Sequence, residues 1–127
     1  MSFSYVIDSY AWVEYFRGTK EGAAAKAYIE GKDHSTCSIT IAELAEKYKR
    51  ENKDFSEDFH FIMSKSEIIG LSCDIALAAG EINFENKKKI KNWGLSDAII
   101  LATAKMFNAT VVTGDPHFKN LNAVMIN

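Results

Sequence analysis

Short apolar runs alternate with longer amphipathic segments along most of the chain. Short runs of β-branched and aromatic residues are typical of buried strands, and apolar residues at helical spacing mark the segments between them. The pattern predicts strands at 5–8, 35–39, 67–71, 110–113 and 123–126, and helices at 10–17, 20–30, 41–52, 56–65, 74–88 and 97–107. Ser9, Thr40 and Ser96 are the expected N-caps of three of these helices.

Strands separated by helices are typical of a parallel sheet with helices on both faces, so we expect an α/β fold. The chain has 127 residues and no linker or repeat, which favours a single domain spanning 1–127. In an open parallel sheet the ligand site lies at the carboxyl ends of the strands. The residues that follow each strand are therefore the first candidates for function.

Composition and charge limit the possible partners. Hydrophobic residues make up 47% of the chain, yet no stretch is long enough to span a bilayer and the N-terminus does not resemble a signal peptide, so we expect a cytoplasmic protein. The formal net charge is −2, so any attraction to nucleic acid must be local. Cys37 and Cys73 lack metal-type spacing, and both are expected to be small buried hydrophobes.

Four acids lie near predicted strand ends. Asp8 ends the first strand, Glu43 follows the second, Asp115 follows the fourth, and Asp97 opens the helix before the fourth. A parallel sheet would bring Asp8, Glu43 and Asp115 to one edge, within reach of Asp97. Asp8 is the most telling of them, because a carboxylate inside an apolar run must be hydrogen-bonded, paired or bound to a metal.

Each of the other acids also has a purely structural interpretation. Asp97 could stabilise the start of its helix, and Asp115 could be a turn residue. Glu43 lies off the apolar stripe of its helix and could pair with Lys47 in solvent. Asp97, in contrast, shares a helix face with apolar residues, so we expect its side chain to point inward.

Converging carboxylates repel one another, and a divalent cation relieves the repulsion. Oxygen ligands suit Mg²⁺ or Mn²⁺, whereas zinc usually takes histidine or cysteine. Such ions polarise phosphoryl oxygens and activate water, and the sequence contains neither a P-loop nor a dinucleotide fingerprint. The acids therefore indicate metal-assisted phosphoester chemistry.

Four segments in the same order resemble the PIN domain, and in particular the small VapC-type ribonuclease toxins: 6–12, 41–44, 95–104 and 112–118. The resemblance covers nearly the whole chain. It implies a three-layer α/β/α fold with a short central parallel sheet, and a Mg²⁺- or Mn²⁺-dependent endoribonuclease that leaves a 5′-phosphate and a 3′-hydroxyl. It also implies a homodimer that is held inactive by a partner antitoxin, with no membrane association.

The resemblance also implies roles for individual residues. Those that match the family's metal-binding acids are Asp8, Glu43, Asp97 and Asp115. Thr113 matches a hydroxyl residue that supports the site, and Ser9 matches a small polar residue beside the first acid. His117 stands where the family frequently has a further acid, which raises the question of whether a second metal is held.

A lysine-rich segment precedes Trp93 and offers a possible RNA contact through Lys87, Lys88, Lys89 and Lys91. On this interpretation the lysines bind phosphates and Trp93 stacks on a base, whereas the simpler alternative is a solvated helix end. Lys47, Lys49 and Arg50 admit the same two interpretations.

Three rival functions are weaker. A phosphorelay receiver domain needs a second acid next to Asp8, where Ser9 stands, and an aspartyl phosphatase needs one two residues later, where Tyr10 stands. The remaining alternative is a non-catalytic PIN-like module that binds RNA or protein. Missing acids would favour it, and all four are present.

Overall fold

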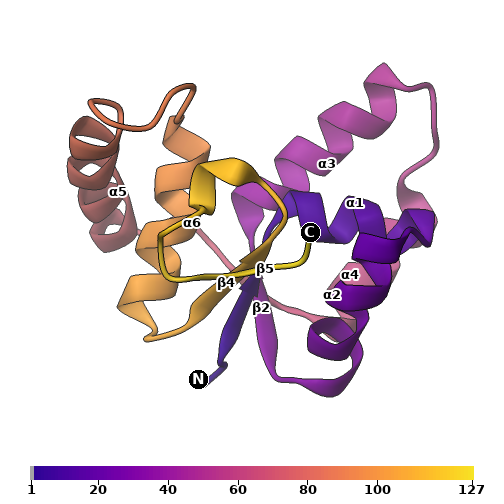
Figure 1. Cartoon of the computed structure of the whole chain (residues 1–127). Helices are drawn as coiled ribbons and strands as arrows, with labels where there is room; N and C mark the ends of the chain where they lie inside the picture. Colours follow the sequence, from indigo (N-terminus) through magenta and orange to yellow (C-terminus); the bar gives the residue numbers. More distant parts are fainter. Residues whose placement is uncertain (1) are drawn as a thin grey trace.

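The computed structural model describes residues 2–127, and its centre is a five-stranded sheet. Figure 1 shows the sheet between the surrounding helices. The strands are β1 (Tyr5–Ile7), β2 (His34–Cys37), β3 (Glu67–Ile69), β4 (Thr110–Thr113) and β5 (Ala123–Met125). Their order across the sheet is β3-β2-β1-β4-β5, and every neighbouring pair is parallel. All five strands therefore end at the same edge, with β1 in the middle.

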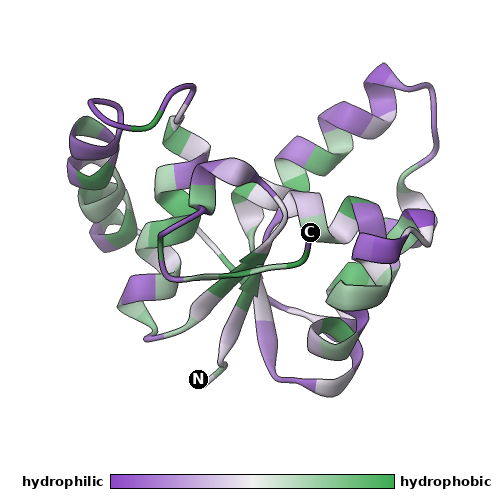
Figure 2. Ribbon diagram, in the orientation of Figure 1, coloured by the Kyte–Doolittle hydropathy of each residue, from purple (hydrophilic) through white to green (hydrophobic). Residues whose placement is uncertain are grey.

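Helices cover both faces of the sheet, which makes the predicted three layers (Figure 1). The helices are α1 (Ser9–Arg17), α2 (Lys20–Gly31), α3 (Ser38–Arg50), α4 (Ser56–Lys65), α5 (Cys73–Asn86) and α6 (Leu95–Met106), with a 3-10 turn η1 (Pro116–Phe118). Helices α1 to α4 pack on one face around Trp12 and Leu44, and α5 and α6 pack on the other around Ile100. Figure 2 shows the hydrophobic centre of the sheet enclosed between these layers.

The predicted helices and strands are all present, but all three expected N-caps are wrong. Ser9 lies inside α1, whose N-cap is Asp8, and α6 begins two residues earlier than expected, after Gly94. The β-branched run around Thr40 suggested a longer strand, whereas β2 ends at Cys37 and α3 begins at once. Thr40 is consequently a fully buried residue inside α3, and Glu43 lies in its second turn.

The two cysteines differ in environment. Cys37 is buried, as expected, but Cys73 is exposed at the start of α5, so the prediction of two buried cysteines is wrong for Cys73. The helix begins there because the Ser72 hydroxyl accepts a hydrogen bond from the backbone N–H of Ile75, which places Cys73 on the outer side of the first turn. Among residues 2–127, no helix is both long enough and apolar enough to cross a membrane.

Candidate functional site

The four acids singled out in the sequence line one pocket at the carboxyl edge of the sheet. Its volume is about 400 Å³, and Asp8, Glu43, Asp97 and Asp115 all contribute to its wall, together with Ser9. Asp8 and Asp115 follow the adjacent strands β1 and β4, while Glu43 and Asp97 come from α3 and α6. The parallel order of the strands thus brings together acids that are far apart in the chain.

Asp8 is the most buried of these acids, with only 4% of its surface exposed. The hydroxyl of Thr113 on the neighbouring strand donates a hydrogen bond of 2.7 Å to Asp8 Oδ2, and the backbone N–H of Asp115 donates to the Thr113 hydroxyl oxygen at 3.0 Å. Burial raises the pKa of Asp8 to about 7, and the Thr113 hydrogen bond opposes this effect. An ionised Asp8 therefore needs a compensating charge that these hydrogen bonds do not supply.

Glu43 is half-buried and faces the pocket. Its Oε1 atom is buried and has no hydrogen-bond partner within residues 2–127. Burial raises the pKa of its carboxyl group, the charges of Asp97 and Asp115 add to the rise, and the Ser96 hydroxyl opposes it. The solvent pair with Lys47 does not form, because Lys47 Nζ lies 2.6 Å from Glu51 Oε2 instead.

Asp97, Asp115 and His117 form a compact group at one side of the pocket. His117 Nδ1 lies 3.0 Å from Asp97 Oδ2 and 3.5 Å from Asp115 Oδ1. The backbone N–H of Gly94 donates to Asp97 Oδ2 at 3.0 Å, and that of His117 donates to Asp115 Oδ1 at 2.9 Å. Asp97 therefore stabilises the start of its helix and Asp115 stabilises its turn, as the structural interpretations expected. The second oxygen of each carboxylate takes no part in these bonds.

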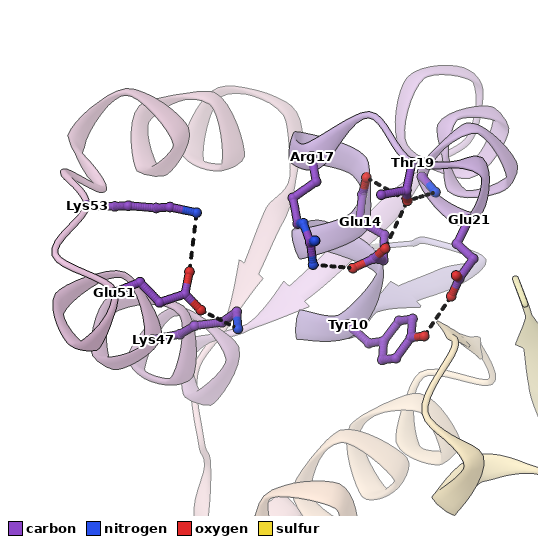
Figure 3. A network of polar contacts seen from close by, with 9 residues as sticks. Tyr10, Glu14, Arg17, Thr19, Glu21, Lys47, Glu51 and Lys53 are labelled. Carbon is purple, nitrogen blue, oxygen red and sulfur yellow. Dashed lines mark hydrogen bonds and ion pairs between the residues drawn. The ribbon is translucent and has the colours of Figure 1, made fainter.

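Gly114 lets the chain turn close to α1 just before Asp115. A Cβ atom at this position would lie 2.2 Å from the ring of Tyr10, so no other residue fits without moving that ring. The Tyr10 hydroxyl in turn donates to Glu21 Oε2 at 2.6 Å, which holds the ring in place (Figure 3). The position of Asp115 at the pocket therefore depends on a contact between two distant segments.

Basic side chains line the outer wall of the same pocket. They are Arg17 of α1 and Lys47 and Arg50 of α3. Each lies near an acid; Figure 3 shows Arg17 with Glu14, at 3.5 Å, and Lys47 with Glu51. Sequence reasoning singled out Lys47 and Arg50 but missed Arg17. Arg17 lies in the last turn of α1, the helix that follows Asp8, and this place in the chain was the signal that could have revealed it.

The lysines after α5 are exposed and do not line the pocket. The segment that contains them and the far end of α3 project from the same end of the molecule on opposite sides of the sheet (Figure 1). Trp93 is only 3% exposed and packs against Phe118, with ring centroids 5.5 Å apart. The interpretation in which Trp93 stacks on a base is therefore wrong, because the α5–α6 connection folds its ring into the core.

The pocket fits a divalent cation on chemical grounds. Several carboxylates surround it, one carboxylate oxygen of Glu43 is buried without a hydrogen-bond partner among residues 2–127, and Asp8 is too buried to ionise easily alone. A hard cation that prefers oxygen ligands would neutralise the clustered carboxylates, bind the unpartnered Glu43 oxygen and favour the ionised form of Asp8. Asp97, Asp115 and His117 also offer ligand atoms within 4.8 Å of one another.

A model of the PIN domain family matches residues 5–124, nearly the whole chain. The chain belongs to the PIN domain family. The match includes all four pocket acids as well as Ser9 and Thr113. No curated protein sequence matches the chain significantly, so the family model and the solved structures carry the comparison.

Solved structures share the fold over nearly the full length of this PIN domain. A chain of a toxin–antitoxin complex from Klebsiella pneumoniae is 26% identical, with a TM-score of 0.77 and 98% of both chains covered. A chain of VapBC2 from Rickettsia felis, bound to a DNA fragment from its promoter, is 23% identical, with a TM-score of 0.74 and 95% and 96% coverage. VapC20 of Mycobacterium tuberculosis, a sarcin-ricin loop cleaving toxin, is 15% identical, with a TM-score of 0.77 and 95% and 97% coverage.

Proposed function

We propose that this PIN domain is a divalent-metal-dependent endoribonuclease and the toxin of a toxin–antitoxin pair that acts in the cytoplasm. PIN-domain toxins of the VapC type are in general metal-dependent ribonucleases. The single observation that carries the proposal is the convergence of Asp8, Glu43, Asp97 and Asp115 on one pocket. Mg²⁺ and Mn²⁺ are the ions we propose, because the ligands are mainly carboxylate oxygens.

In this proposal the four acids hold the cation, and Thr113 orients Asp8 through its hydrogen bond. A bound divalent ion would supply charge neutralisation, polarisation of a phosphoryl oxygen and a lowered pKa for bound water. The basic wall of Arg17, Lys47 and Arg50 would hold the phosphates on either side of the cleaved bond.

The proposed reaction is an in-line hydrolysis of a phosphodiester. A water oxygen forms a new bond to phosphorus, and the P–O3′ bond breaks. The attacking water gives a proton to a pocket carboxylate, and the departing O3′ takes up a proton from solvent. The products are a 5′-phosphate and a 3′-hydroxyl.

The decisive test replaces a pocket acid without changing its size. Asp97→Asn retains an acceptor for the Gly94 backbone N–H but removes a charge from the pocket, so we expect Mg²⁺-dependent cleavage of total RNA to fall by roughly 100-fold or more. Asp8→Asn should have the same effect. Unfolding midpoints in EDTA should not fall for either variant.

Asp33→Asn makes the same chemical change at an exposed position between α2 and β2 and is the matched control. It should cleave RNA at the wild-type rate. Undiminished cleavage by both pocket variants, or cleavage that persists in EDTA, would favour the non-catalytic alternative.

The partner we propose is an antitoxin protein. Its support is the similarity to a chain of the Klebsiella toxin–antitoxin complex over 98% of the protein. Purification from the native source should yield a second, tightly bound protein, and adding that protein should suppress RNA cleavage. Purification of the chain alone at native expression levels would speak against the assignment.

We also propose that the protein forms a homodimer through α5. Leu77 and Phe84 lie two turns apart on this helix and are 70% and 65% exposed. Asp74 lies near the beginning of the helix, and Lys87 directly follows its end. Two α5 helices packed antiparallel about a twofold axis would therefore bring opposite charges together while they cover both apolar side chains.

Phe84→Asp would place a charge against an apolar side chain of this interface. We expect light scattering to give a dimer mass for the wild type and a monomer mass for Phe84→Asp. Met63→Asp, which introduces the same charge at an exposed apolar position of α4, should leave the dimer intact. A wild-type protein that is monomeric at micromolar concentration would rule out this dimer.

A further inference from the structure

His117 occupies the position where the family frequently has a further acid, and the structure turns its ring toward two of the pocket acids. The side chain is 25% exposed, and its Nδ1 atom faces carboxylate oxygens of both Asp97 and Asp115. The three side chains together offer ligand atoms that lie within 4.8 Å of one another. An imidazole nitrogen is thus built into a group that otherwise offers only oxygen.

The backbone around His117 holds the ring in this position. Asp115 Oδ1 accepts a hydrogen bond from the His117 backbone N–H at 2.9 Å, and Pro116 begins the short turn η1. The next residue, Phe118, is fully buried against Trp93. The imidazole therefore belongs to an anchored turn, so its position beside the two carboxylates is set by the fold.

The separation of the atoms also fits neighbouring ligands of one ion. Ligands held about 2.1 Å from an octahedral cation lie roughly 3 Å apart when they are adjacent. His117 Nδ1 and Asp97 Oδ2 are 3.0 Å apart. The same distance also suits a hydrogen bond between His117 and Asp97. A direct measurement on the bound ion is therefore needed to tell a metal ligand from a hydrogen-bond partner.

We propose that His117 is a nitrogen ligand of the divalent cation held by Asp97 and Asp115 and that it biases the site toward Mn²⁺ over Mg²⁺. The inference rests on the proposed function, since it concerns the same cation. Imidazole nitrogen binds first-row transition ions well, whereas Mg²⁺ prefers oxygen. Exchanging an acid for histidine also removes one negative charge from the group, which weakens its attraction for a hard cation.

Pulsed EPR of bound Mn²⁺ detects a coordinated nitrogen directly. The wild-type protein loaded with Mn²⁺ should show ¹⁴N modulation from a bound imidazole, and His117→Asn should lose it. His60→Asn, which removes an exposed histidine from α4, should retain the signal and is the matched control. Mn²⁺ that binds without ¹⁴N modulation, or modulation that survives in His117→Asn, would overturn the proposal.

Calorimetry at one fixed pH then measures the preference between ions. The ratio of the Mg²⁺ and Mn²⁺ dissociation constants should fall by about 10-fold or more in His117→Asp, because an oxygen ligand replaces nitrogen. An unchanged ratio would overturn the proposed bias. If the wild-type protein binds neither ion, the proposed function fails together with this inference; if it binds Mn²⁺ without nitrogen coordination, only this inference fails.

Discussion

At the residue scale, Asp8 shows how a carboxyl group responds to an apolar surrounding. Its pKa rises from 3.8 to about 7 because burial disfavours the charged form. Between these two values the folded protein keeps a proton that the unfolded chain has released. The free energy of unfolding therefore falls as the pH rises through this window, until Asp8 is ionised in both states.

This linkage predicts how the metal-free protein responds to pH. In EDTA, the Asp8 contribution to the free energy of unfolding should fall by about 2 to 3 kcal/mol between pH 5 and pH 8. Asp8→Asn cannot ionise but can still accept the Thr113 hydrogen bond, so it should abolish this part of the pH dependence. Urea unfolding at the two pH values measures both proteins, and equal pH dependence in wild type and variant would contradict the predicted shift.

At the scale of elements, α1 and α2 approach each other closely at Gly22. A Cβ atom on Gly22 would lie 2.0 Å from the backbone carbonyl oxygen of Glu14, so the contact excludes any side chain. This contact holds α2 against α1, the helix that has Asp8 as its N-cap and ends at Arg17, and both of these residues line the pocket. The packing of two helices thus contributes to the position of the site.

Gly22→Ala should force α1 and α2 apart and lower the free energy of unfolding by about 2 to 3 kcal/mol. Gly31→Ala is the matched control, because it lies in the last turn of the same helix and its Cβ would meet no atom within 4 Å. We expect it to have little effect on stability. Urea unfolding of the two variants tests the contact, and equal stability would show that α2 shifts without cost.

At the scale of the whole molecule, positive charge gathers in two places although the protein is weakly acidic. The net charge is −2, but Arg17, Lys47 and Arg50 gather at the pocket wall. A second basic segment, Lys87 to Lys91, lies on the opposite side of the sheet at the same end of the molecule (Figure 1). RNA held between the two groups would pass over the acidic pocket.

Two double variants separate the contributions of these groups. Lys47→Ala with Arg50→Ala should weaken RNA binding and reduce the slope of log K against log salt by about 1.4, since two phosphate contacts are lost. Lys87→Ala with Lys88→Ala also removes two positive charges, but at a site outside the pocket. Its effect on the slope measures how much the second basic segment contributes to RNA binding. Binding titrations at several salt concentrations give both slopes, and an unchanged slope in the first variant would exclude the pocket wall from RNA binding.

Periodicity in the sequence was sufficient to predict the layered fold, because strands and helices differ in the spacing of their apolar residues. It also pointed to Asp8 and Asp97, whose surroundings in the chain are apolar. Local sequence patterns were less informative about where each helix or strand begins and ends. The β-branched residues near Thr40 favour a strand in isolation, yet packing on the sheet makes them part of α3.

Only the tertiary structure decided what surrounds each of these residues. The helical wheel placed Glu43 in solvent, but the crossing of α3 over the edge of the sheet turns it into the pocket. The same folding buries Trp93 and brings His117 to Asp97. The sequence by itself determined which residues carry charge and which segments form strands. The distances between the charged residues depend on contacts between segments that are far apart in the chain, and no local pattern in the sequence encodes those contacts.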